Sequence, residues 1–119
     1  MAAKKTTVFV GGVASYAPPA RVRVRKGFIK LAPKSLGWSA RRGMAGRSDV
    51  GTIPLEHIAL LRCDPDGSVV VAYREGGQGG QERQLAFWPD KRQPLSANEV
   101  LEEIERWADD ERAAGSVAE

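Results

Sequence analysis

The chain has 119 residues, of which 42% are hydrophobic and 28% are charged, the proportions of one soluble globular domain with a small core. No apolar stretch approaches the ~18–20 residues of a membrane span, and the single cysteine, Cys63, excludes an internal disulfide. The formal net charge of +3 conceals a division, because residues 1–50 hold eleven Lys/Arg and one acid whereas residues 51–119 hold seven Lys/Arg and fourteen acids.

The first part of the chain predicts strands with a basic, alternating pattern. Residues 6–13 are rich in β-branched and apolar side chains and indicate a strand, which we place in an N-terminal arm of residues 1–19. Residues 21–25 alternate strictly between arginine and valine, the period of a strand with one face in water. If Lys26 and Gly27 form a two-residue turn, Val24 pairs with Ile29; a longer loop is the alternative, because lysine is unusual at the start of such a turn.

The hairpin register predicts which side chains lie on each face of this sheet. Directly paired residues share a face, and a slip by one residue would exchange the faces of both strands. The side chains expected on the core face are those of Val22, Val24, Ile29 and Leu31. The side chains expected on the outside are those of Arg21, Arg23, Arg25, Phe28 and Lys30.

The middle of the chain predicts a loop followed by several short strands. Residues 33–49 are expected to form a long basic loop, interrupted at most by a short strand around Trp38. Strands are expected over residues 52–55, 58–63, 68–73 and 83–88. Pro54 favours a sheet edge for the first of these, since proline cannot donate to a neighbouring strand. Residues 64–67 indicate a turn, and the glycine-rich residues 76–80 indicate a hairpin tip.

The C-terminal part predicts one amphipathic helix over residues 97–114. Ser96 is the expected N-cap, Glu99 completes a capping box, and Leu95 and Val100 form a hydrophobic staple. One apolar stripe follows at helical spacing and must pack on the sheet; it consists of Val100, Leu101, Ile104, Trp107 and Ala108. Trp107 and Trp88 are expected in the core, and residues 115–119 are expected to fray after a C-terminal Gly115.

Six or seven strands followed by one amphipathic helix resemble a pleckstrin-homology-like domain. Residues 26–31 (KGFIKL), 52–58 (TIPLEHI) and 64–69 (DPDGSV) are similar to passages of bacterial members, and the resemblance covers residues 20–114. It implies a mainly β (α+β) fold, in which a bent antiparallel sheet or partly open barrel of six to seven strands is capped by the C-terminal helix. It also implies a non-catalytic binding or adaptor module.

Basic residues and two aromatic residues are the candidates for ligand binding. Lysine and arginine bind the phosphates of lipids or nucleic acids, and aromatic rings among them suit base stacking or a membrane interface. The alternative interpretation is a solvated outer sheet face. The candidates are Arg21, Arg23, Arg25, Lys26, Phe28, Lys30, Lys34, Trp38, Arg41, Arg42 and Arg47.

The sequence predicts no catalytic site, metal site or cofactor. His57 is the only histidine, and the glycine pairs lack the strand–GxxxxGK[ST]–helix context of a phosphate loop. Cys63 ends an apolar run and is expected to be a buried, unreactive thiol. A chain with one such cysteine fits a reducing, cytoplasmic compartment, where the protein is free or peripheral at a membrane.

Three functions remain open at this point. The first is a pleckstrin-homology-like adaptor that binds a protein partner or an anionic membrane surface through its basic face. The second is a small β-barrel that binds RNA or single-stranded DNA through the basic sheet and Phe28. The third is a self-assembling structural protein, in which the basic half of one copy contacts the acidic half of the next.

Overall fold

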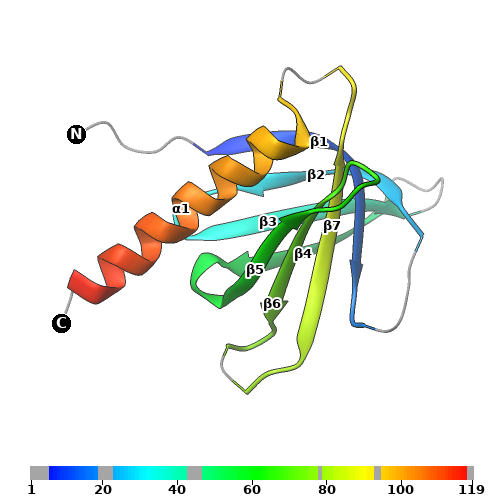
Figure 1. Ribbon diagram of the computed structural model, residues 1–119. Coiled ribbons are helices and arrows are strands. Elements are labelled where there is room, and N and C mark those ends of the chain that lie inside the picture. The colour runs from blue at the N-terminus through cyan, green and yellow to red at the C-terminus, as the bar shows by residue number, and fades with distance from the viewer. Residues whose placement is uncertain (1–5, 19–22, 43–46, 78, 93–94, 118–119) are drawn as a thin grey trace.

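The computed structural model describes residues 6–18, 23–42, 47–77, 79–92 and 95–117 (Figure 1). A bent sheet of seven strands is covered on one side by a single long helix. No described helix is long and apolar enough to cross a membrane. The elements are β1 (Thr7–Tyr16), β2 (Arg25–Leu31), β3 (Ser35–Arg42), β4 (Arg47–Pro54), η1 (Leu55–His57), β5 (Ile58–Cys63), β6 (Val69–Arg74), β7 (Glu82–Pro89) and α1 (Ala97–Val117).

All neighbouring strands are antiparallel, in the order β4-β3-β2-β1-β7-β6-β5. The strand expected near the N-terminus is β1, and it is the middle strand of the sheet. It pairs with β2 along its first part and with β7 along its second, so it joins the two halves of the sheet. The expected class is confirmed: an open antiparallel sheet with one C-terminal helix.

Two glycines permit a very close approach between strands. A Cβ at Gly11 would lie 2.0 Å from the carbonyl oxygen of Trp88, and a Cβ at Gly27 would lie 1.8 Å from that of Ser39. No side chain fits such a space without a shift of backbone, so these positions require glycine. They lie on β1 and β2, respectively.

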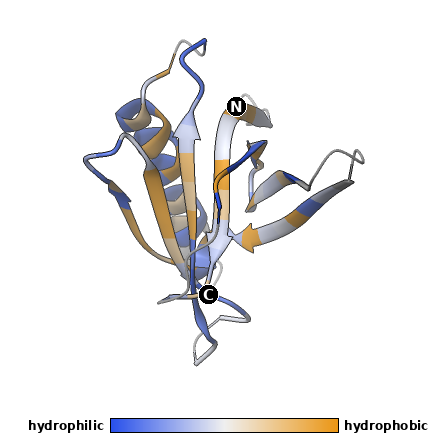
Figure 2. Ribbon diagram, turned by 90° about the vertical axis from the view of Figure 1, so that its right-hand side faces the viewer, coloured by the Kyte–Doolittle hydropathy of each residue, from blue (hydrophilic) through white to orange (hydrophobic). Residues whose placement is uncertain are grey.

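One hydrophobic core lies between the inner faces of the strands and α1. The strands contribute large side chains such as Phe9, Ile29 and Phe87, and α1 contributes Ile104 and Trp107. Figure 2 shows hydrophobic residues along the strands and polar residues at many of the connecting loops. The expected burial of Trp107 is confirmed, whereas Trp88 at the end of β7 is only half-buried and lies outside this cluster.

The start of α1 follows from its capping residues, as the sequence predicts. The Ser96 amide donates to Glu99 Oε1 at 3.4 Å, and the Glu99 amide donates to Ser96 Oγ at 3.4 Å. Val100 is buried beneath them, with Leu95 packed against the core. The expected end is wrong, because the helix continues through Gly115 to Val117.

The expected hairpin at Lys26-Gly27 is wrong. Residues 25–31 form one uninterrupted strand, in which Ile29 pairs with Phe9 on one side and with Trp38 on the other. Gly27 serves the close approach to β3 rather than a turn. Since side chains alternate along a strand, Arg25 lies on the same face as the buried Ile29 and Leu31, and not on the outside.

Val24 departs from the expected register as well. It is exposed, although the hairpin would have placed it in the core. Val22 lies outside the described residues, so its expected burial stays untested.

The expected loop over residues 33–49 is also wrong, since most of it forms the hairpin of β3 and β4. The short strand expected around Trp38 does exist and extends from Ser35 to Arg42. Leu36 and Ala40 are buried on its inner face, but intervening glycine, serine and arginine obscure that alternation in the sequence. β4 lies at a sheet edge, as Pro54 predicted, and β5 has the predicted bounds.

Candidate functional site

The first four strands present one continuous face to solvent, here called the outer face. Side chains alternate along each strand, so the strand registers define which residues lie side by side on it. Its members are Val8, Val10 and Gly12 of β1, Lys26, Phe28 and Lys30 of β2, Gly37, Ser39 and Arg41 of β3, and Ser48, Val50 and Thr52 of β4. One row of directly paired residues crosses all four strands and consists of Val10, Phe28, Ser39 and Val50.

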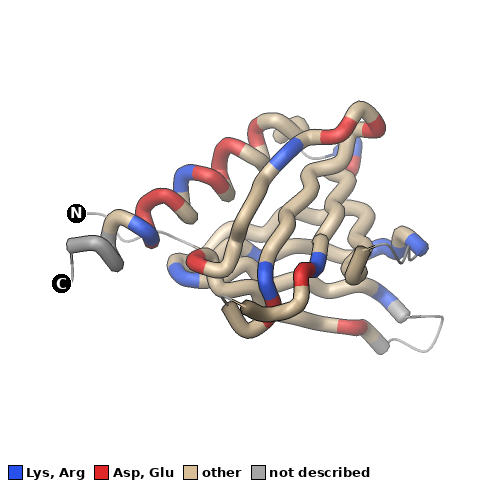
Figure 3. Tube along the Cα trace, turned by 60° about the horizontal axis from the view of Figure 1, so that its bottom comes forward, with Lys and Arg blue, Asp and Glu red and all other residues tan. Residues whose placement is uncertain are grey.

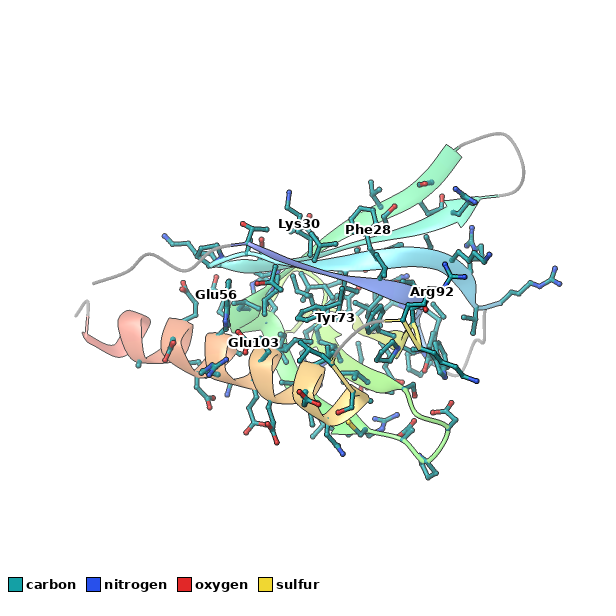
Figure 4. The ribbon with its side chains drawn as sticks, turned by 90° about the horizontal axis from the view of Figure 1, so that it is seen from above. Phe28, Lys30, Glu56, Tyr73, Arg92 and Glu103 are labelled. Carbon is teal, nitrogen blue, oxygen red and sulfur yellow. The ribbon has the colours of Figure 1, made fainter. Side chains whose placement is uncertain are left out.

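The outer face combines cations with exposed apolar side chains. Phe28 is 39% exposed and Val50 is 72% exposed, and the cations Lys26, Lys30 and Arg41 lie beside their row. Figure 4 shows Phe28 and Lys30 on the side of the sheet that faces away from α1. None of the outer-face positions is acidic.

The acid of these strands, Asp49, lies on the opposite face. Its Oδ2 is 3.0 Å from Nη1 of Arg25, and both side chains are partly exposed. Arg25 is therefore neutralised by a partner on β4, which the sequence did not reveal. Because Asp49 lies on the opposite face, the charged side chains of the outer face are all cations.

Two hollows adjoin Lys26 on this surface. One, of about 300 Å³, lies over β2, β3 and β4 and is lined by Phe28, Ser39 and Arg41. The other, of about 680 Å³, lies over the glycines of β1 and is bounded by Trp88 and by the loop after β7. Lys26 borders both hollows and so connects them, and one acid, Asp90, lines the larger of the two.

Lys91 and Arg92 line the larger hollow, and sequence reasoning missed both. The backbone amide of Arg92 donates to Oδ1 of Asp90 at 2.9 Å, so the Asp90 carboxylate stabilises the turn that carries these cations. They reach the outer face because β7 pairs with β1. The available signal was a pair of adjacent cations shortly after the strand predicted over residues 83–88.

The structure brings together only some of the predicted site residues. Lys26, Phe28, Lys30 and Arg41 share the outer face, whereas Arg25 does not. Trp38 lies on the inner face, where its ring covers Gly51; a Cβ there would be 2.5 Å from the indole Nε1.

The other predicted cations lie away from the described outer face. Arg23 is exposed ahead of β2, and Lys34 is exposed in the turn before β3. Arg21 and the side chains of Arg42 and Arg47 lie outside the described residues.

The acidic residues gather elsewhere, above all on the helix. Figure 3 shows acidic positions recurring along α1. Within the helix, Glu103 accepts a hydrogen bond from Trp107 Nε1 at 2.8 Å and forms an ion pair with Arg106. The acids of α1 therefore lie apart from the outer face, whereas Lys91 and Arg92 of the same part of the sequence lie beside it.

His57 is half-buried, and its Nε2 lies 4.0 Å from Oε1 of Glu56. Among the residues that the structure describes, no group of three or more His, Cys, Asp or Glu side chains is arranged to hold a metal ion. Neither its contact with Glu56 nor a metal-binding cluster among the described residues assigns a chemical role to His57.

Cys63 is half-buried at the edge of the core, rather than fully buried as predicted. Burial raises the pKa of its thiol, and the neighbouring Asp64 carboxylate raises that pKa further. Because the thiolate is the nucleophile, we expect iodoacetamide to alkylate Cys63 several-fold more slowly in the folded protein than in denaturant at the same mildly alkaline pH. Mass spectrometry of quenched samples measures the two rates, and equal rates would contradict this expectation.

The open sheet of seven antiparallel strands with one C-terminal helix is a pleckstrin-homology-like fold. The solution structure of the N-terminal PH domain of the human ARAP2 protein is similar to it, with a TM-score of 0.55 and 17% sequence identity over 87% of this chain and 81% of that chain. This likeness establishes the fold. Comparisons of the sequence with protein-family models and with curated proteins found no match.

Proposed function

We propose that this protein is a non-catalytic binding module that docks an acidic, partly apolar segment of a protein partner on its outer face. Since a fold alone does not define a function, the proposal rests on that surface. The observation that carries it is the mixture of cations and exposed apolar side chains, with no acid among them.

The shape of the outer face favours a protein segment over a bilayer. Ser39 is buried between the exposed side chains of Phe28 and Val50, and hollows lie on both sides of Lys26. Hollows of this kind can receive the side chains of a partner segment. Exposed apolar residues rimmed by polar ones are typical of protein interaction sites.

The apolar row also favours a protein segment over nucleic acid. Single-stranded nucleic acids stack successive bases on aromatic side chains. On the outer face the row of Phe28 continues with Val10 on one side and with Ser39 and then Val50 on the other, which offer no stacking surface. We propose that the protein binds this partner inside the cell, either in solution or beside a membrane.

Changing Lys26, Lys30 and Arg41 together to serine tests the proposed surface. We use a synthetic peptide of alternating glutamate and leucine as the probe, and Trp fluorescence or NMR shifts as the measurement. Three exposed charge contacts of about 0.2–1 kcal/mol each predict a loss of affinity of roughly tenfold. The dependence of binding on salt is expected to become weaker as well.

The matched control is a triple change of Arg62, Arg74 and Arg106 to serine, which removes the same charge away from the outer face. We expect this control to bind the peptide almost as the wild type does. Equal binding by both triple variants would overturn the proposal. Tighter binding to phosphatidylserine vesicles or to single-stranded RNA than to the peptide, lost in the outer-face variant, would assign that surface to a membrane or to nucleic acid instead.

A further inference from the structure

A third hollow, of about 340 Å³, lies between β4 and the hairpin of β6 and β7. It is lined by β4, by η1, by residues 73–76 and 83 of that hairpin, and by Trp38 of β3. Val50 and Thr52 form its border with the outer face, but none of the outer-face cations lines it. Its volume lies in the range of about 300–1,000 Å³ that is usual for small-molecule sites. The hollow is therefore a candidate site separate from the docking surface.

Three aromatic side chains from three different elements line this hollow, namely Trp38, His57 and Tyr73. The indole of Trp38 lies against Gly51, because a Cβ at that glycine would be 2.5 Å from the indole Nε1. His57 is half-buried, and Tyr73 is 7% exposed and lies in the interior of the molecule (Figure 4). Aromatic rings bind other planar rings in offset-stacked or edge-to-face arrangements. These walls favour a planar aromatic ligand.

Among the described residues, the charged side chains that line the hollow are two cations and one acid: Arg74, Arg83 and Glu75. Oε2 of Glu75 is 3.8 Å from Nε of Arg83, so these two charges offset each other. Nη1 of Arg74 donates to the carbonyl oxygen of Gly80 at 3.1 Å, which holds the guanidinium beside the hairpin.

The charge of Arg74 determines which ligands the hollow favours. A guanidinium has five N–H donors, and a pair of them matches the two oxygens of a carboxylate. Glu56, whose Oε1 is 4.0 Å from Nε2 of His57, does not line the hollow. The lining therefore carries an excess of one positive charge, which favours a ligand with a single negative charge.

We propose that this hollow binds a small aromatic carboxylate, with its ring against Trp38 and His57 and its carboxylate on Arg74. The aromatic walls supply the contact with the ring, and the guanidinium distinguishes the acid from neutral compounds of the same shape. The site uses none of the outer-face cations, so it does not depend on peptide docking there.

Titration with 2-naphthoate, followed by ¹H–¹⁵N NMR spectroscopy, tests this site. The three tryptophan indole N–H signals report on three places, because Trp38 lines this hollow, Trp88 lines the large hollow of the outer face and Trp107 lies in the core. We expect the Trp38 signal to shift and to saturate at millimolar concentration, while the signals of Trp88 and Trp107 stay in place. No saturable shift at Trp38, or a shift confined to Trp88, would overturn the proposal.

Two related compounds separate the contribution of the ring from that of the charge. 2-Naphthamide has the same ring without the charge, and cyclohexanecarboxylate has the same charge without the aromatic ring. The amide loses a charge-assisted hydrogen bond and should bind roughly tenfold more weakly than 2-naphthoate. Cyclohexanecarboxylate loses the ring contacts and should bind more weakly as well. Equal binding of either compound and 2-naphthoate would contradict the proposed chemistry.

Arg74→Gln removes the proposed partner of the carboxylate and should weaken binding of 2-naphthoate by roughly tenfold. The side chain is exposed, so this variant is expected to fold, which circular dichroism verifies. Arg92→Gln removes the same charge from the outer hollow and is the matched control, with binding expected to equal that of the wild type. Gly51→Ala displaces the Trp38 indole and should also weaken binding. Equal affinities of Arg74→Gln and Arg92→Gln would show that Arg74 does not hold the ligand.

Discussion

Replacing Trp107 with alanine is expected to lower the free energy of unfolding by about 3–5 kcal/mol. The side chain is 5% exposed and fills the contact between α1 and the sheet, and its Nε1 donates to Glu103. Alanine would leave a cavity and remove that hydrogen bond. The whole free energy of unfolding of such a domain is only about 5–15 kcal/mol. We therefore expect a large shift in the denaturation midpoint.

Urea denaturation followed by far-UV circular dichroism measures this change. Glu102→Ala on the exposed side of α1 is the matched control and should alter the free energy of unfolding by less than about 0.5 kcal/mol. If Trp107→Ala unfolds at the same urea concentration as this control, α1 is not held to the sheet by the contacts described.

A second large effect is expected from Gly27→Ala. The new Cβ would lie 1.8 Å from the carbonyl oxygen of Ser39, so the backbone of β2 or β3 must move. Overpacking of this kind costs about 1–3 kcal/mol, and more where backbone must shift. The same movement would displace Lys26 and Phe28, and we therefore expect weaker binding of an acidic peptide along with lower stability.

Gly37→Ala on β3 is the control for this substitution. A Cβ there would approach its nearest neighbour at 3.8 Å, an ordinary contact. Alanine also restricts the unfolded chain, so this variant is expected to match the wild type or to gain up to about 1 kcal/mol. Equal midpoints for Gly27→Ala and Gly37→Ala in urea denaturation would show that β2 and β3 do not approach as closely as described.

The elements that could be predicted from the sequence are those whose signals are local. The start of α1 depends on Ser96 and Glu99, three residues apart, and both hydrogen bonds of the capping box are present. The turn over residues 64–67 likewise depends on adjacent residues, and Gly67 has the positive φ, +87°, that favours glycine. Such interactions are complete within a few residues, so no knowledge of the fold was needed.

The candidate site depended on strand partners, which no local pattern specifies. In the sequence, Gly27 is equally compatible with a turn and with a close approach between two strands. Only its pairing with β3 decided between these interpretations. Arg25 alternates with valine as a solvated residue would, yet Asp49, 24 residues away, pairs with it on the inner face. Periodicity predicts which residues share a face, but it does not predict which of the two faces is covered.

The residues of the candidate site also fall into two groups, those that a local pattern predicted and those that only strand pairing added. Its central residues, Lys26, Phe28 and Lys30, were predicted because they lie close together in the sequence, although Lys26 was expected in a turn and is part of β2. Lys91 and Arg92 joined them only because β7 returns to pair with β1. By itself the sequence determined β1, β5, β6, β7, the helix and the separation of charge along the chain, since these depend on neighbouring residues and on counting. Tertiary structure decided which cations meet on one surface, because pairing between strands distant in the chain is settled by the packing of the whole core.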